Sequence, residues 1–270
     1  MLMKRVEIIA IGKEILSGQT LDTNSSWLAK RITALGGMVG RICIRDDDVQ
    51  AIVGEIQASF NNSAQVIITT GGLGPTFDDK TLAGIAEATE RPLSLNPDAL
   101  AFVTRRYAEL YNEGFVEDPA ITPPREKMAH VPQESELLAN PVGTAPAVFL
   151  KTTQGVIFAL PGVPKEMHAI FEESVLPRLT EILGPQAYQE EIVNTGLGDE
   201  SVIAGIIDQV MKEVPDTYLK SKATSFGTGV ELEVIITAAG PEEGTVRERV
   251  AKAKRLLLEL IETRPTRTGG

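Results

Sequence analysis

The sequence has little of what zinc sites, disulfide frameworks and membrane spans require. It contains one cysteine and two histidines, so no disulfide can form within the chain and no zinc ligand set can be assembled. Its first apolar run, Val6 to Ile11, is too short for a signal peptide or a membrane span. We therefore expect a cytoplasmic protein without a membrane partner, in which any metal ion is bound by oxygen atoms.

Basic charge is also in short supply. The chain carries 26 basic and 37 acidic residues, giving a net charge of −11 that repels nucleic-acid phosphates. The most basic stretch, Arg247 to Arg255, alternates with acidic residues and is typical of a solvated helix face. These features exclude nucleic acid as a partner and favour a small-molecule ligand.

Apolar residues are plentiful enough for a large core. They make up 43% of 270 residues, a length that favours one domain and a smaller second one. Buried strands are predicted at Val6 to Ile11, Met38 to Ile44 and Val66 to Thr70, with helices in the two intervals between them. Thr23, Asn24 and Ser25 offer caps for the first of these helices, which is expected to stop at Gly36-Gly37. This alternation predicts an α/β fold, with a mostly parallel sheet covered by helices on both faces. Ligands of such sheets lie at the carboxyl ends of the strands.

The rest of this domain is expected to close near Leu183. The pattern predicts helices at Thr81 to Glu90 and Asp98 to Asn112, and a hairpin of Ala147 to Leu150 with Val156 to Leu160. Four prolines between Gly114 and Gln133 indicate a long irregular excursion that covers the site or mediates association. The next helix, from Pro164, should be bent or interrupted by Pro177.

Gly184-Pro185 is the predicted domain boundary, which divides the chain into residues 1–183 and 184–270. The second domain is expected to be a small α/β unit with a mobile tail from Arg267 to Gly270. Its predicted elements, in order, are a strand at Glu191 to Thr195, a helix at Ser201 to Val214, a strand at Val230 to Ala238 and a helix at Glu243 to Glu262.

The strongest chemical signal is the glycine-rich turn from Thr70 to Asp79, which lies between a buried strand and a helix. Its three glycines let backbone N–H groups point into one concavity, and the helix adds a positive dipole end, which together suit a phosphate. Thr76 is expected to cap the helix, with Asp79 three residues later as in a capping box. A tight structural turn explains the glycines about equally well, and the spacing matches neither the P-loop nor the dinucleotide fingerprint.

Polar and acidic turns follow the other predicted strands. They contain Glu14, then Asp22 and Asn24, and Asp46 to Asp48. Each one alone is adequately explained as a loop or a helix start. Together, at the carboxyl ends of neighbouring parallel strands, they converge on one crevice with enough oxygen ligands for Mg²⁺ or a similar cation.

Four motifs of the first domain occur together: Gly12-x-Glu14-Ile15-Leu16-x-Gly18 with Asp22-x-Asn24, Gly71-Gly72-Leu73-Gly74-Pro75-Thr76-x-Asp78-Asp79-x-Thr81, Asn140 to Pro146, and Leu160-Pro161-Gly162-Val163-Pro164-x-Glu166-Met167. In these motifs the chain resembles the molybdopterin-binding-like domain of the CinA family, which shares its fold with the MoaB and MogA proteins. The resemblance covers about Val6 to Phe171, and the remainder is similar in element order to a KH-type, ferredoxin-like α+β domain.

The resemblance implies a pyrophosphatase that requires a divalent cation (Mg²⁺, Mn²⁺ or Co²⁺) and hydrolyses ADP-ribose or a similar dinucleotide such as FAD. It also implies that the nicotinamide-mononucleotide deamidase activity of CinA is absent, because the chain ends before that domain begins. We further expect a homo-oligomer. Phe77 departs from the family pattern, since histidine is frequent at its position, and Lys13 stands where Asp or Asn is common.

Roles follow from this hypothesis. Asp79, Asp47 and Glu14 are the candidate catalytic residues, and Asp47, Asp78 and Asp79 are the candidate metal ligands. The candidate substrate- and phosphate-binding residues are Gly71, Gly72, Leu73, Gly74, Thr76, Asp22, Asn24, Gly143 and Thr144.

Two other functions fit the same residues. The chain could be a molybdopterin-binding or adenylyl-transferring protein of molybdenum-cofactor synthesis, which an adenylated product would reveal. It could also be a non-catalytic nucleotide-binding module, in which the phosphate cradle binds without turnover. A shared fold does not decide among these activities.

Overall fold

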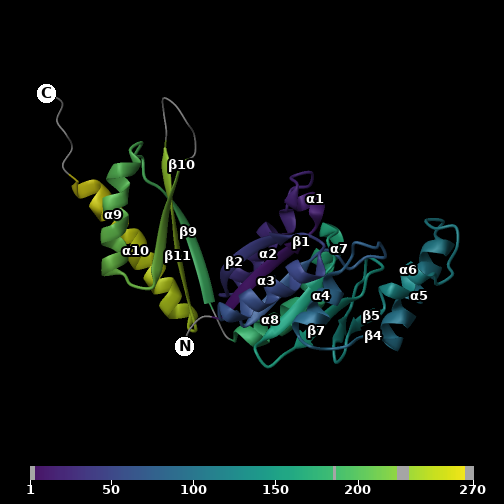
Figure 1. Cartoon of the computed structure of the whole chain (residues 1–270). Coiled ribbons are helices and arrows are strands. Elements are labelled where there is room, and N and C mark those ends of the chain that lie inside the picture. The colour runs from purple at the N-terminus through teal and green to yellow at the C-terminus, as the bar shows by residue number, and fades with distance from the viewer. Residues whose placement is uncertain (1–3, 185–186, 224–230, 265–270) are drawn as a thin grey trace. The chain divides into compact units, whose positions relative to one another are not determined.

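The computed structural model describes residues 4–184, 187–223 and 231–264 (Figure 1). Two compact units are present: Met1–Thr33 with Gly37–Leu183, and Ala34–Gly36 with Gly184–Gly270. Pro185, half of the predicted boundary, and the predicted mobile tail lie outside the described residues. Over the described ranges, no helix has both the length and the apolar character needed to cross a membrane.

A six-stranded sheet forms the centre of the first unit, in the strand order β2-β1-β3-β8-β7-β6. The elements, in chain order, are β1 (Arg5–Ile11), α1 (Lys13–Leu16), α2 (Thr23–Ala34), β2 (Met38–Arg45), α3 (Val49–Asn61), β3 (Val66–Thr70), α4 (Thr81–Ala88), β4 (Leu93–Leu95), α5 (Pro97–Asn112), α6 (Pro123–Lys127), β5 (His130–Pro132), β6 (Glu136–Leu138), β7 (Ala147–Lys151), β8 (Val156–Leu160), α7 (Pro164–Ile170), the π-helical turn η1 (Phe171–Val175) and α8 (Leu176–Leu183).

The predicted, mostly parallel sheet is confirmed. Strands β2, β1, β3 and β8 run parallel, and β3 is buried along its whole length, as its apolar and β-branched residues indicate. Strand β7 returns antiparallel to β8 as the predicted hairpin, and β6 is antiparallel to β7. Because the four parallel strands end at one edge, the loops that follow them meet there.

Helices cover both faces of this sheet, as expected (Figure 1). On one face, Ile9 and Ile67 pack in a core cluster with Ile52 of α3 and Ile85 of α4. On the other face, α2 lies against α7, where the rings of Trp27 and His168 stack with centroids 4.0 Å apart. This two-sided burial explains why the central strands lack polar alternation.

Helix α2 ends as its sequence indicates, but it begins differently. Its last turn closes with a hydrogen bond from Gly37 N to Ile32 O, and Gly36 adopts a positive φ of 74°. At its start, the Asp22 carboxylate accepts a hydrogen bond from Ser25 N, so Asp22 caps the helix in place of the predicted Thr23, Asn24 and Ser25.

The stretch from Gly114 to Gln133 is more regular than its prolines indicate. It contains helix α6 and strand β5, and β5 pairs with β4 as a small antiparallel ribbon. The two prolines that begin α6 occupy positions where the missing N–H would be unpaired anyway. Ahead of Pro177, the helical run widens into η1, so its irregularity precedes the proline that was expected to cause it.

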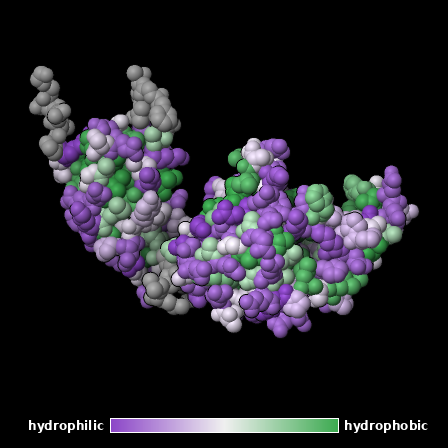
Figure 2. Space-filling view, viewed as in Figure 1, coloured by the Kyte–Doolittle hydropathy of each residue, from purple (hydrophilic) through white to green (hydrophobic). Residues whose placement is uncertain are grey.

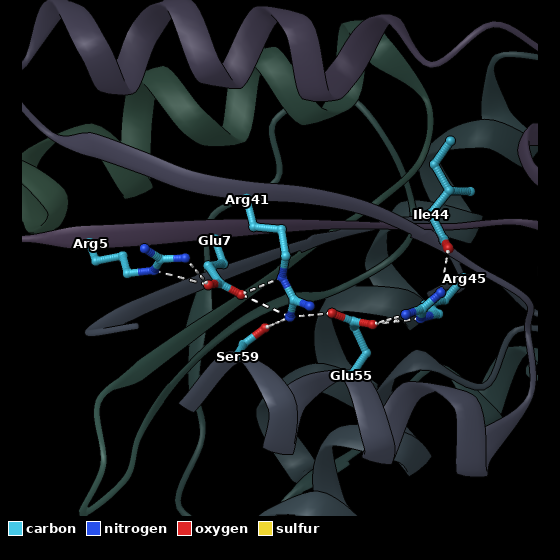
Figure 3. A network of polar contacts seen from close by, with 7 residues as sticks. All are labelled: Arg5, Glu7, Arg41, Ile44, Arg45, Glu55 and Ser59. Carbon is cyan, nitrogen blue, oxygen red and sulfur yellow. Dashed lines mark hydrogen bonds and ion pairs between the residues drawn. The ribbon is translucent and has the colours of Figure 1, made fainter. Parts of the chain in front are cut away.

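A buried network of ions connects β1, β2 and α3 (Figure 3). Glu7 and Glu55 are 1% and 2% exposed. Arg41 Nη2 pairs with both carboxylates, and Arg5 and Arg45 complete the chain of contacts. Each buried carboxylate therefore has the charged partner that it needs.

The second unit is a three-stranded antiparallel sheet with two helices. Its elements are β9 (Ala187–Asn194), α9 (Glu200–Glu213), β10 (Thr217–Ala223), β11 (Leu232–Gly240) and α10 (Glu243–Thr263), with the strand order β10-β11-β9. Strand β11 alternates buried and half-buried residues, which is typical of a sheet covered on one face. Strand β10 was not predicted. Val230, where the second of the two strands predicted for this unit began, lies outside the described residues.

Candidate functional site

A cavity of about 650 Å³ lies where the parallel strands end, within the size range of small-molecule sites. The loops after β1, β2, β3 and β8 line it, together with the turn before β7. The residues that the sequence analysis proposed and that line it are Glu14, Asp22, Asn24, Asp47, Gly71, Gly72, Leu73, Gly74, Thr76, Asp78, Asp79 and Thr144. Gly143, also proposed, lies one residue from this lining.

The glycine turn owes its path to two residues with positive φ. Gly71 has a φ of 98°, and a Cβ placed on it would lie 2.1 Å from the Ile11 carbonyl oxygen. Gly72 has a φ of 66°, and a Cβ there would lie 2.2 Å from Thr81 Oγ1. The Thr81 hydroxyl donates to Gly71 O at 2.8 Å. Only glycine fits these two positions.

Three N–H groups of the turn remain available to a ligand. Gly71 N donates to Leu160 O, and Thr76 N donates to the Asp79 carboxylate. Within the described chain, the N–H groups of Gly72, Leu73 and Gly74 make no hydrogen bond, and all three residues line the cavity. Consecutive free N–H groups of this kind form an anion-binding concavity.

The end of the turn is closed by Thr76 and two aspartates. Thr76 Oγ1 is 2.5 Å from Asp78 Oδ1 and 2.5 Å from Asp79 Oδ2. The hydrogen bond with the Thr76 hydroxyl is the largest influence that lowers the pKa of Asp78. The main chain of Asp78 and the positive charges of Lys127 and Lys80 lower this pKa as well. The prediction that Thr76 caps the helix is wrong, because α4 begins at Thr81 after Lys80, and the Thr76–Asp79 pair closes a separate turn.

Lys127, in helix α6, forms hydrogen bonds with the main chain of this turn. Its ammonium group donates to Gly74 O at 3.3 Å and to Thr76 O. Burial lowers the pKa of Lys127, while Asp79 and Asp78 raise it. Lys127 comes from α6, in the segment that was expected to be irregular, so the sequence analysis gave it no role.

Asp47 lies across the cavity, on the loop after β2. Its Oδ2 atom accepts a hydrogen bond from Lys13 N at 2.8 Å. Burial raises the pKa of Asp47; that main-chain hydrogen bond lowers it, and the charges of Glu14, Asp78 and Asp46 raise it again. Lys13 contributes its backbone here, so the unusual side chain at this position does not affect the contact.

The cavity is acidic throughout. Six carboxylates line it, and none of the lining residues is basic. In the described part of the chain, no three histidine, cysteine or acidic side chains are grouped closely enough to hold a metal ion. Asp47, Asp78 and Asp79 therefore face one cavity without forming a ready-made ligand set. Such carboxylates suit an ion that keeps waters and ligand phosphates among its partners.

Asn24, in the first turn of α2, forms a hydrogen bond with the loop before α7. Its Nδ2 atom donates to Gly162 O at 2.8 Å, and the residue is 6% exposed. Its Oδ1 atom finds no hydrogen-bond partner among the residues that the structure describes. Asp22, the neighbouring candidate, uses one carboxylate oxygen for the α2 cap.

The wall opposite the glycine turn contains Thr144 and Ala145. Behind it lies Glu166, which is 8% exposed and lines the cavity. Burial raises the pKa of Glu166, and hydrogen bonds from Asn140 and the Ala145 main chain lower it, as does the charge of Arg106. Asn140 and Glu166 stand in the family-like motifs, but the sequence analysis assigned neither of them a role.

Apolar side chains are exposed at the mouth of the cavity. Leu21 is 82% exposed and Val163 is 58% exposed, and both are lining residues. Apolar surface also gathers over α1, where Leu16 is 54% exposed (Figure 2). Phe77 is 87% exposed and lies outside the lining, so its side chain does not shape the cavity.

Residues 7–181 match the family model described as "Probable molybdopterin binding domain". The chain belongs to this molybdopterin-binding domain family. Protein PH0439 of Pyrococcus horikoshii is 36% identical over 242 residues, covering 90% of this chain and 92% of that protein. A protein of Aeropyrum pernix is 40% identical over 242 residues, covering 88% and 87% of the two chains.

A solved relative supports the same assignment. The crystal structure of CinA from Thermoplasma acidophilum, a protein described there as having unknown function, is 33% identical with a TM-score of 0.59. The match covers 66% of this chain and 98% of that one. The resemblance to the CinA family's molybdopterin-binding-like domain is thus confirmed, and the whole cavity lies within the range that the family model matches.

Proposed function

We propose that the cavity binds a phosphorylated small molecule of the molybdopterin or nucleotide type together with a divalent cation. One observation carries the proposal: among the described residues, three with unpaired N–H groups and six acidic ones line one cavity, which has no basic lining residue. The N–H groups suit a phosphate, but the carboxylates repel one. A cation between them resolves this conflict.

Asp47 and the pair Asp78 and Asp79 are the residues that would hold the cation. A bound divalent cation would neutralise phosphate charge and polarise a phosphorus–oxygen bond. The glycine turn would receive one phosphate through the N–H groups of Gly72, Leu73 and Gly74. The free Oδ1 atom of Asn24 and the hydroxyl of Thr144 suit the hydroxyl groups of an attached sugar or side chain.

Hydrolysis of a dinucleotide such as ADP-ribose or FAD is the second candidate, and Asp47 favours it. In this role Asp47 would be the base and not a ligand of the cation, which Asp78 and Asp79 would hold; burial, which raises the pKa of Asp47, makes it a better proton acceptor than an ordinary aspartate. Asp47 would take a proton from a water that attacks one phosphorus, the bridging P–O bond would break, and the glycine turn would hold the departing phosphate. The cation would offset the negative charge that develops on the phosphate, and Glu14 would assist as a further ligand or base.

The remaining expectations belong to this proposal. We propose a KH-type identity for the second unit from its strand-helix-strand-strand-helix order, together with a cytoplasmic location and a homo-oligomeric assembly. Adenylyl transfer uses the same phosphate cradle, and it requires ATP consumption that hydrolysis does not.

Calorimetric titration with ADP, ADP-ribose and FAD, with and without Mg²⁺, Mn²⁺ or Co²⁺, tests the proposal. We expect binding only when a cation is present, and an affinity at least about tenfold weaker in Asp47→Asn, which loses one charge at the cation. Asp98→Asn, the same change at an exposed helix start outside the cavity, should bind like the wild type. Binding that ignores cations, or an absence of binding to all three ligands, contradicts the proposal.

Analysis of the nucleotide products after the same titrations separates binding from hydrolysis. Release of AMP that Asp47→Asn abolishes supports hydrolysis, whereas binding without AMP supports a binding protein. Asp47→Asn should not be less stable at neutral pH. Because the folded-state pKa of Asp47 is raised, its ionisation costs stability as the pH rises through that pKa, and asparagine avoids this cost. A urea unfolding midpoint at or above that of the wild type therefore excludes unfolding as the cause of lost binding.

A further inference from the structure

Glu166 is a buried carboxylate that the proposed chemistry does not use. It lies in the first turn of α7, and its side chain lines the cavity beside Thr144 and Ala145. A carboxylate that is 8% exposed requires hydrogen-bond donors to offset its lost hydration. The identity of those donors indicates what the residue does.

The donor belongs to the turn from Asn140 to Ala145: Asn140 Nδ2 donates to Glu166 Oε1 at 2.5 Å. Asn140 also closes the turn itself: Nδ2 donates to Ala145 O at 2.8 Å, and Oδ1 accepts from Gly143 N at 2.9 Å. The carboxylate is thus bonded to the side chain that closes the turn.

The turn is shaped to fit around this carboxylate. A Cβ placed on Gly143 would lie 1.7 Å from Glu166 Oε1 and 1.9 Å from its Cδ atom, far inside van der Waals contact. On its other side, Arg106 of α5 donates to Gly143 O at 2.9 Å and to Val142 O at 2.7 Å. The peptide at Gly143 is therefore held between a carboxylate and a guanidinium group.

We propose that Glu166 is a positioning residue, whose carboxylate fixes the turn from Asn140 to Ala145 and thereby holds Thr144 in the cavity wall. Thr144 is the one hydroxyl residue of this turn, and it lies between Gly143, which packs against the Glu166 carboxylate, and Ala145, whose carbonyl oxygen accepts from Asn140. Gly143 supplies the space that the carboxylate occupies. The part of this inference that concerns a ligand rests on the proposed function of the cavity.

Amide hydrogen exchange tests the positioning role without a ligand. In Glu166→Ala, the amides of residues 140 and 142–145 should exchange about tenfold faster, because the hydrogen bond that holds the Asn140 side chain is lost. Glu166→Gln keeps an acceptor oxygen but loses the charge that strengthens this hydrogen bond, so an intermediate rate is expected. Glu173→Gln, the same change at an exposed position of η1, should exchange like the wild type.

A second variant keeps the test decisive if Glu166→Ala does not fold. Gly143→Ala should displace the turn and accelerate exchange over residues 140–146, since its methyl group overlaps the carboxylate. In the double variant with Glu166→Ala the overlap is gone. The acceleration of exchange should therefore be smaller than the product of the accelerations in the two single variants. Unchanged exchange in Glu166→Gln and Gly143→Ala, both folded, overturns the inference.

Ligand titration separates this inference from the proposed function. With Mg²⁺ and ADP-ribose, Glu166→Gln should bind about three- to tenfold more weakly, as expected when one hydrogen bond that orders the site is weakened. Faster exchange with wild-type affinity overturns the claim that the turn positions Thr144 for a ligand. If exchange accelerates but the wild type binds none of the ligands, the positioning of the turn is supported and the proposed function is wrong.

Discussion

The two walls of the cavity hold their shapes by different means. The glycine turn is fixed by its own backbone, since Gly71 and Gly72 take positive φ values and pack against main-chain and hydroxyl atoms. The turn from Asn140 to Ala145 is fixed by side chains from two helices, Arg106 and Glu166. A wall built from backbone shows in the sequence as a glycine run, whereas a wall held by distant side chains does not.

The largest loss of stability is expected at Gly71, in the wall that is built from backbone. In Gly71→Ala the added methyl group meets the Ile11 carbonyl oxygen, a main-chain atom that cannot move aside, and the positive φ adds strain. We expect a loss of about 3 kcal/mol in the free energy of unfolding by urea denaturation. Gly54→Ala is the control: nothing lies within 4 Å of its added methyl group in α3, so it should be neutral or stabilising. Equal stability of the two variants would show that Gly71 does not fix the wall.

The side-chain wall should lose less when Arg106 is replaced. Arg106→Met keeps an aliphatic chain but removes the donors to Gly143 O and Val142 O, so we expect a loss of about 1–2 kcal/mol in the free energy of unfolding. Hydrogen exchange should accelerate over residues 140–146 and remain unchanged over residues 70–79. Arg105→Met, at a neighbouring side chain that is 65% exposed, should match the wild type in both measurements. Faster exchange over residues 70–79 as well would mean that the two walls are not independent.

The smallest effect is expected at Lys127, a side chain of α6 that bonds to the main chain of the glycine turn. Lys127→Met removes donors to Gly74 O and Thr76 O, but it also relieves the burial of a charge, so the net loss at pH 7 should be at most about 1 kcal/mol. Because the folded-state pKa of Lys127 is lowered, the wild type gains stability as the pH rises from that pKa toward 10.5. The difference in unfolding free energy between wild type and Lys127→Met should therefore widen from pH 7 to pH 10. Lys30→Met, at an exposed position of α2, should show no such widening.

The sequence predicted the parallel sheet because its signals are local. Short runs rich in apolar residues identified β1 and β3, and glycine at position 36 identified the end of α2. Strands β4 and β5 are three residues long and gain their stability from pairing across the intervening α5 and α6, so no local pattern identifies them. Strand β10 has a half-exposed polar face and was missed for a similar reason.

The site was predictable where its residues follow strand ends. Asp47 and the glycine turn could be placed at one edge because parallel strands end together. The start of α2 was misplaced because Asp22 and Thr23 are both good caps, and only the hydrogen bond to Ser25 N distinguishes them. Lys127 and Glu166 were missed because each bonds to atoms that are far away in the sequence.

The ion network between β1 and β2 also constrains how the edge strand can change over evolution. Glu7 is paired opposite Arg41, and the register shift beside it places Gly40 against the Arg5 guanidinium, where a Cβ would lie 2.5 Å from it. Inserting or deleting one residue in β2 would turn Arg41 to the other face and leave a buried carboxylate without its cation. Length changes are therefore tolerated in the loops that end at the cavity more readily than in the strand that borders the sheet.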